Sequence, residues 1–103
     1  MMNRTERKKL YKQAIDKWGL PAQLGMLMEE SAELIQATHK VMRHINNKTS
    51  VWRGLVEEIA DVEIMIEQIK TQVDWQCIEE RVETAKHDKL LRLKKMLEKA
   101  SSD

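Results

Sequence analysis

The amino-acid sequence predicts an all-α fold, a helical bundle of about four helices that is completed by oligomerisation. Only 3 of the 103 residues are Gly and one is Pro, and aromatic residues make up 4% of the chain, whereas charged residues make up 34%. This composition favours helices over sheets. Apolar residues recur every three or four positions, which is the period of an amphipathic helix. Helix-breaking residues are few, so the connections are short and neighbouring helices are expected to be antiparallel.

The breakers divide the chain into four expected helices. Gly19-Leu20-Pro21 is the first break, and proline suits the first turn of the helix that follows. The second break contains the turn formers Asn46 and Asn47, after which Ser50 can cap the third helix. Asp74 is placed to cap the fourth. The expected helices run from about Thr5 to Lys17, Pro21 to Arg43, Val51 to Val73 and Trp75 to Lys99, within one domain of residues 1–103 that has a frayed tail at about 100–103.

Charge and length exclude several classes of protein. The 18 Lys and Arg residues nearly balance the 17 Asp and Glu residues, which argues against a nucleic-acid binder. The polar N-terminal segment has no apolar run behind it, and no stretch approaches the roughly 20 apolar residues that span a bilayer, so a cytoplasmic protein is expected. A lone chain of this size buries only about two-thirds of its extended surface. An oligomer could cover apolar residues of the first and last helices, namely Leu10, Ile15, Trp18, Ile78, Val82, Leu90, Leu93 and Leu97.

Two acidic pairs intrude on apolar helix faces. On a wheel of about 100° per residue, Glu30 lies inside the edge of the apolar stripe of the second helix, and Glu33 lies just beyond it. Glu58 and Asp61 occupy the same positions on the third helix. The two stripes are Leu24, Leu27, Leu34, Ile35, Thr38, Val41 and Met42, and Val51, Leu55, Ile59, Val62, Ile66, Ile69 and Val73. When the sequence is shifted so that Glu30 falls on Glu58, both pairs follow one pattern, Glu-Glu-x-Ala-acid-aliphatic. Four carboxylates are therefore expected to converge if the helices pack antiparallel.

Four neighbouring carboxylates repel one another and lose hydration, so they require cations. No Lys or Arg lies within either stripe. Oxygen ligands favour Mg²⁺, with Mn²⁺ as the alternative, over zinc. The Glu-x-x-His pairs of ferritin-like di-iron bundles are missing. A single acidic pair would be interpreted as solvated surface, but two matched pairs favour a metal site.

Glu30-x-x-Glu33 followed by Glu58-x-x-Asp61 resembles the metal motif of the all-helical nucleoside triphosphate pyrophosphohydrolases, and most of all that of the compact MazG-like proteins often found in phages and prophages. The resemblance covers about residues 18 to 93, through Trp18-Gly19, Gln23-Leu24, Glu29 to Leu34, Glu57 to Val62 and Lys89 to Leu93. It implies Mg²⁺-dependent cleavage of an NTP or dNTP between the α- and β-phosphates, giving the monophosphate and pyrophosphate. It also implies a dimer or tetramer in which Glu30, Glu33, Glu58 and Asp61 are the metal ligands and catalytic residues.

The resemblance further indicates substrate-binding residues. Lys89 and Arg92 lie one turn apart on the last helix, where the family often presents basic residues to phosphate, although a solvated basic face is an equal interpretation. Lys40 follows the acidic pair along the second helix, where it could reach the phosphates, but a surface role is favoured; it is the next candidate if Lys89 and Arg92 do not bind phosphate. The candidate contacts to the base are Trp18, Gln23 and Trp52, with ordinary packing as the alternative for both tryptophans.

Two other functions compete with this interpretation. A non-enzymatic helical adaptor could use the acidic pairs as salt-bridge partners between helices. A phosphoribosyl-ATP pyrophosphohydrolase-like enzyme would share the metal motif. The sequence does not select the nucleotide.

Overall fold

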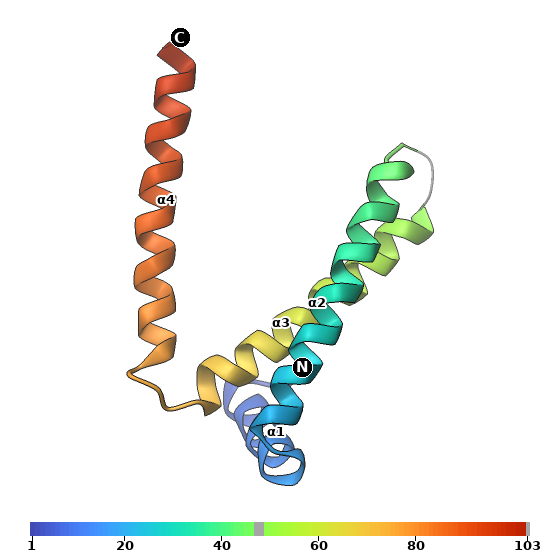
Figure 1. Ribbon diagram of the computed structural model, residues 1–103, viewed down its shortest axis with the longest axis vertical. Coiled ribbons are helices and arrows are strands. Elements are labelled where there is room, and N and C mark those ends of the chain that lie inside the picture. Colours follow the sequence, from blue (N-terminus) through green and yellow to red (C-terminus); the bar gives the residue numbers. More distant parts are fainter. Residues whose placement is uncertain (47–48, 103) are drawn as a thin grey trace. The chain divides into compact units, whose positions relative to one another are not determined.

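A computed structural model describes residues 1–46 and 49–102. Within these ranges the chain forms four helices and no strand (Figure 1), namely α1 (Arg4–Trp18), α2 (Leu20–Arg43), α3 (Thr49–Gln72) and α4 (Ile78–Ser102). The predicted all-α class is confirmed. The chain divides into two compact units, Met1–Gln72, which contains α1 to α3, and Val73–Asp103, which contains α4. None of the helices described is long and apolar enough to cross a membrane.

Individual residues at the helix boundaries explain where α1 ends and where α1 and α2 begin. Asn3 caps α1, because its Oδ1 accepts a hydrogen bond from the backbone N–H of Glu6 at 2.9 Å. Gly19 ends α1 and precedes α2 with a φ of 87°, in the left-handed region that side chains disfavour. Pro21 lies in the first turn of α2, as predicted. Ser50 lies inside α3 instead of capping it, so that prediction is wrong, and Asn47 lies outside the described residues.

The fourth helix begins three residues later than the sequence predicts. Gln76 and Cys77 have φ values of 46° and 56°, and left-handed residues cannot continue a right-handed helix. The backbone N–H of Arg81 donates to the carbonyl of Cys77 at 3.0 Å, so the first turn starts there and not at Asp74. The tail predicted from residue 100 is helical as far as Ser102, and Asp103 lies outside the described residues.

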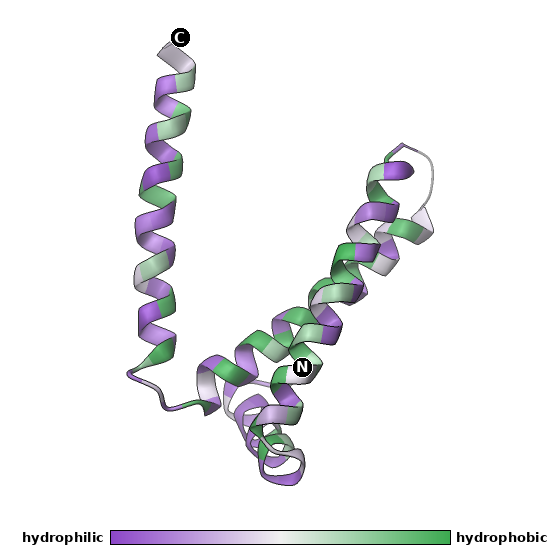
Figure 2. Cartoon of the chain, viewed as in Figure 1, coloured by the Kyte–Doolittle hydropathy of each residue, from purple (hydrophilic) through white to green (hydrophobic). Residues whose placement is uncertain are grey.

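A regular seam joins α2 to α3. Its positions are buried or half-buried and alternate in spacing between four and three residues, which is the pattern of a coiled coil. The α2–α3 seam consists of Gln23, Leu27, Glu30, Leu34, Ala37 and Val41 from α2, and of Val51, Leu55, Glu58, Val62, Met65 and Ile69 from α3. Figure 2 shows hydrophobic positions recurring along both helices among hydrophilic ones. Two glutamates therefore occupy core positions of the helix pair.

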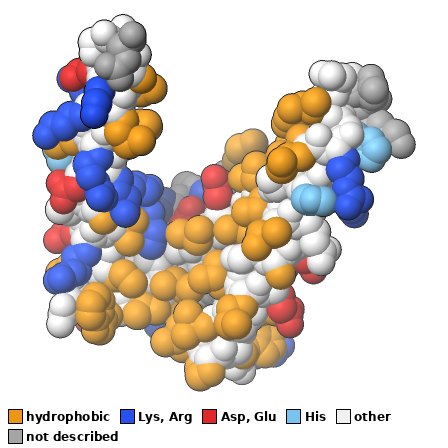
Figure 3. All heavy atoms as spheres, turned by 45° about the horizontal axis from the view of Figure 1, so that its top comes forward, with side chains coloured by type: hydrophobic (Ala, Val, Ile, Leu, Met, Phe, Trp, Pro, Cys, Tyr) orange, Lys and Arg blue, Asp and Glu red, His pale blue; other side chains and the backbone are white. Residues whose placement is uncertain are grey.

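The seam differs from the apolar stripes predicted on the wheel. Ile35 and Met42 are 70% and 69% exposed, and Ile59 and Ile66 are also exposed. The wheel follows the most hydrophobic residues, whereas packing of two helices selects the 3.5-residue spacing. A second apolar line, the outer apolar row, is left exposed. It consists of Leu24, Met28, Ile35 and Met42 on α2, and Trp52, Val56, Ile59 and Ile66 on α3. Hydrophobic side chains are accordingly prominent on the surface in Figure 3.

The first helix is fixed to α3 through one buried tyrosine. The hydroxyl of Tyr11 donates to Glu67 Oε1 at 3.0 Å, and Arg7 forms an ion pair with the same carboxylate at 3.4 Å. Gln68, which is 2% exposed, donates from Nε2 to the Tyr11 carbonyl at 3.3 Å. Burial and the carboxylate of Glu67 raise the pKa of Tyr11. These bonds hold α1 against the C-terminal part of α3.

Candidate functional site

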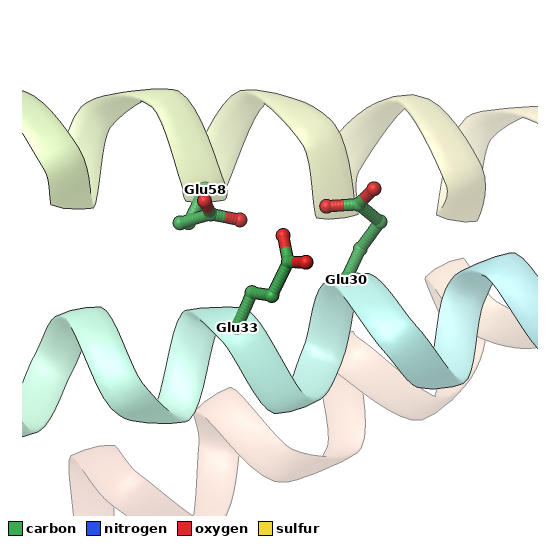
Figure 4. A group of neighbouring side chains, drawn as sticks. All are labelled: Glu30, Glu33 and Glu58. Atoms are coloured by element: carbon green, nitrogen blue, oxygen red, sulfur yellow. The ribbon is translucent and has the colours of Figure 1, made fainter.

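Three carboxylates from two helices converge on one point of the α2–α3 seam. Glu30 and Glu33 project from α2 and Glu58 projects from α3, and their carboxylates point toward one another between the helices (Figure 4). One oxygen of each lies within 4.8 Å of the other two. The antiparallel course of α2 and α3 produces this meeting from two separate segments of the sequence. Asp61 is not part of the three-residue group, but it lies one turn beyond Glu58 on the same helix.

Two oxygens of this group are buried and lack a partner. Glu30 and Glu58 are half-buried and Glu33 is exposed. The Oε2 atoms of Glu30 and Glu58 are fully buried, and no hydrogen-bond partner for either is found among the described residues. A buried polar atom without a partner destabilises a fold, and most such atoms in proteins are bonded to a group, a water or an ion. The two oxygens are therefore positioned to accept a proton, a hydrogen bond or a cation.

The electrostatics of the group favour added positive charge. Loss of hydration on burial, followed by the negative charges of Glu33 and Asp61, raises the pKa of Glu30 from its ordinary 4.5 to about 7. Burial and the same two charges raise the pKa of Glu58. Glu30 would thus take up a proton or a cation near neutral pH, and the raised pKa of Glu58 favours uptake in the same way. The negative charge of Asp61, the predicted fourth ligand, contributes to the raised pKa of both glutamates.

The donor set fits a hard divalent cation. The three converging groups offer carboxylate oxygens, which are the ligands of Mg²⁺ and Mn²⁺, with neither nitrogen nor sulfur among them. A cation between the helices would satisfy the buried Oε2 atoms of Glu30 and Glu58 and would cancel the repulsion that raises their pKa values. The same oxygens could alternatively share a proton, so the arrangement can serve as a cation site or as a proton acceptor.

A hollow of about 470 Å³ opens beside the carboxylates. It lies between α2 and α3, toward the ends of these helices that are joined in sequence, and it has the size of a small-molecule site. The α2–α3 hollow is lined by Glu33, Gln36, Ala37, Lys40, Ser50, Val51, Gly54 and Glu58. Gly54 is inside α3, where glycine costs about 1 kcal/mol relative to alanine. A Cβ built on Gly54 meets no atom within 4 Å, so packing does not require the glycine.

The residues predicted to contact the base do not come together. Trp18 ends α1 and is 59% exposed, with Lys17 Nζ 5.4 Å from its ring centroid. Gln23 is buried in the α2–α3 seam near the start of α2. Trp52 is 44% exposed near the start of α3, which lies at the opposite end of the antiparallel pair. Trp18 and Gln23 could belong to one binding surface, and Trp52 belongs to another part of the unit.

The predicted phosphate-binding residues lie on α4. Lys89 and Arg92 are exposed and three residues apart, so they share one helix face. They belong to the unit Val73–Asp103, whereas the carboxylates belong to the unit Met1–Gln72.

Two features near the carboxylates were not predicted from the sequence. The first is that Glu30 and Glu58 are seam residues and not residues at the edge of an apolar stripe. The alternating four- and three-residue spacing through both glutamates is a signal that could have revealed it. The second is the α2–α3 hollow, for which Gly54 within a helical segment was the available sign.

No protein-family model, curated protein or solved structure matches this chain. The likeness to the MazG-like proteins thus remains an expectation carried by the two acidic pairs and the residues around them.

The raised pKa values predict how stability depends on pH without metal. Since the pKa of Glu30 is about 7 when folded and ordinarily 4.5, the folded chain holds a proton that the unfolded chain releases between these values. The stabilisation linked to that proton is complete below about pH 4.5 and is lost as the pH rises through about 7, and Glu58 acts in the same direction. In chelator-treated buffer, the Tm should fall across this window, measured by circular dichroism.

Glu30→Gln should flatten this fall, because glutamine stays neutral throughout the window. Glu29→Gln is the matched control, since Glu29 is an exposed neighbour outside the converging group. Parallel Tm curves for the wild type and Glu30→Gln would contradict the assignment.

Proposed function

We propose that this protein is a Mg²⁺-dependent nucleoside triphosphate pyrophosphohydrolase of the cytoplasm, which cleaves an NTP or dNTP between the α- and β-phosphates. The observation that carries the proposal is the convergence of Glu30, Glu33 and Glu58 in the seam of a helix pair, with two buried oxygens that have no partner among the described residues. The charge of Asp61, which reaches both seam glutamates, supports its inclusion as a fourth acid.

Each acid has a role that follows from its position. Glu30 and Glu58 would hold the ion from opposite helices with their buried oxygens, and Glu33 and Asp61 would complete the oxygen ligands from the adjoining positions. Mg²⁺, or Mn²⁺ in its place, would supply positive charge to the phosphates and acidify a bound water. One of the four carboxylates would accept the proton of the attacking water. The nucleobase of the substrate has two candidate binding surfaces. Trp18 with Gln23 forms one, and Trp52 belongs to the other.

We also propose that the protein works as a homo-oligomer, a dimer or a tetramer. The outer apolar row supports this, because Met28, Ile35 and Val56 are 74%, 70% and 65% exposed on neighbouring helices. Exposed apolar residues that gather on one part of a surface are characteristic of association sites. Light scattering at micromolar concentration should give about two or four times the chain mass of 12.1 kDa. A monomeric mass together with full activity would exclude an obligatory oligomer.

The enzymatic proposal is tested with a panel of NTPs and dNTPs in Mg²⁺, scored for release of pyrophosphate. We expect the wild type to hydrolyse at least one member and Glu30→Gln and Asp61→Asn to abolish turnover. Loss of a residue that only supports a metal ligand already costs about 10–100-fold, and loss of a ligand itself should cost more. Both variants should remain helical. Glu29→Gln should keep wild-type turnover.

Thermal unfolding separates the enzyme from a non-enzymatic adaptor. Mg²⁺ should raise the Tm of the wild type, because an ion that binds only the folded state stabilises it. The increase should disappear in Glu30→Gln. An adaptor that uses the acids as salt-bridge partners would gain no stability from Mg²⁺.

Lys89 and Arg92 are expected to help bind the triphosphate. A charged hydrogen bond contributes about 1.5–3 kcal/mol, so Arg92→Ala should raise KM by about tenfold or more. The affinity of the free protein for Mg²⁺ should not change, since Arg92 is not part of the carboxylate group. Wild-type kcat/KM in both Lys89→Ala and Arg92→Ala would assign the pair to the solvated surface.

A further inference from the structure

We infer that the α2–α3 hollow binds the distal phosphates of an oligophosphate substrate, and that Lys40 is the cation that holds them. This inference rests on the proposed function, because it assigns the direction in which the substrate leaves the carboxylates. It gives Lys40 a role in binding, whereas the sequence alone favours a surface role for it over a phosphate contact.

The hollow is lined by acidic residues at one end and by a lysine at the other. Glu33 and Glu58 close one end of it, and Lys40 lies beyond them toward the end of α2. Lys40 follows Glu33 by seven residues, which is two helical turns, so both side chains leave the same face of α2 about 10 Å apart along its axis. A phosphate chain and an extended lysine side chain can together cover that distance.

Charge determines which end of a substrate the hollow can receive. An oligophosphate bound through a cation at Glu33 and Glu58 still carries negative charge at its far end, which those carboxylates repel. Lys40 is the only cation among the described residues that line the hollow. Gln36 and Ser50 line it as well and can donate hydrogen bonds to phosphate oxygens. The hollow thus changes from acidic to basic along its length, which matches a phosphate chain with a cation at one end only.

Gly54 leaves room in the hollow for a phosphate, because it has no side chain. It lies one turn before Glu58 on α3, and a Cβ there would enter open space in the hollow and would meet no atom within 4 Å. Glycine is the poorest helix former after proline, so a larger residue at this position would favour the helix and at the same time obstruct the hollow. Gly25 in α2 also has open space around it but does not line the hollow, which makes it a matched control.

The experiment measures binding and turnover separately. Affinity for inorganic tripolyphosphate in Mg²⁺ is determined by calorimetry, and KM and kcat are determined for the preferred nucleotide. The variants are Lys40→Ala, which removes the cation, and Gly54→Leu, which fills the hollow. The controls are Arg43→Ala, which removes the same charge from the same helix outside the hollow lining, and Gly25→Leu.

We expect Lys40→Ala and Gly54→Leu to weaken tripolyphosphate binding and to raise KM by about tenfold or more, with little change in kcat. Lys40→Arg should restore most of the affinity. Both controls should stay within about twofold of the wild type, and the two leucine variants should unfold at or above the wild-type Tm, because leucine favours the helix.

The experiment distinguishes failure of the phosphate assignment from failure of the proposed function. If the wild type hydrolyses nucleotides while Lys40→Ala and Gly54→Leu keep wild-type KM and affinity, the phosphate assignment is overturned and the proposed function stands. Tripolyphosphate binding that depends on Lys40, without hydrolysis of any nucleotide, supports the hollow and overturns the enzymatic proposal. If neither binding nor hydrolysis occurs, both are overturned.

Discussion

Two glutamates in the core seam of a helix pair are the constraint on which the first unit of this structure depends. Apart from these glutamates and Gln23, all positions of the α2–α3 seam carry apolar residues, and all of them are buried or half-buried. Glu30 interrupts the seam on α2 and Glu58 on α3, and each lacks a partner for one buried oxygen among the described residues. Apolar residues there would stabilise the unit more. The helix pair accordingly gives up stability at the one point where its carboxylates meet.

The symmetry of this interruption has a simple origin. Each glutamate follows a seam leucine by three residues and precedes the next seam residue by four, so each acidic pair has the same phase relative to the seam of its own helix. When two equivalent helices pack antiparallel, residues of equal phase lie on the same side of the pair. Glu33 and Asp61 then flank the seam on corresponding sides. Tyr11, Glu67 and Gln68 fix α1 at the other end of α3, away from the hollow.

The sequence predicted the helices and the meeting of three of the four acids, with Asp61 outside the group, and it failed where tertiary packing decides. Helix positions followed from Gly19, Pro21 and the turn-forming residues, since these act locally. The convergence followed from the matched acidic patterns, because facing helices need only equal phase. The exposure of Ile35 and Met42 was not predictable from hydrophobicity, because which of two apolar lines becomes the seam depends on the partner helix. The start of α4 depends on the left-handed backbone of Gln76 and Cys77, which neither residue type favours.

The heptad seam also limits how the length of this protein can vary. One residue inserted between Glu33 and Lys40 would rotate the rest of α2 by about 100° and carry Ala37 and Val41 off the seam, whereas seven inserted residues would preserve the phase. The segment that joins α2 to α3 carries no such requirement. Among proteins built on this plan, natural insertions and deletions should therefore be of any size at the connection but in multiples of seven between the acids and the helix ends.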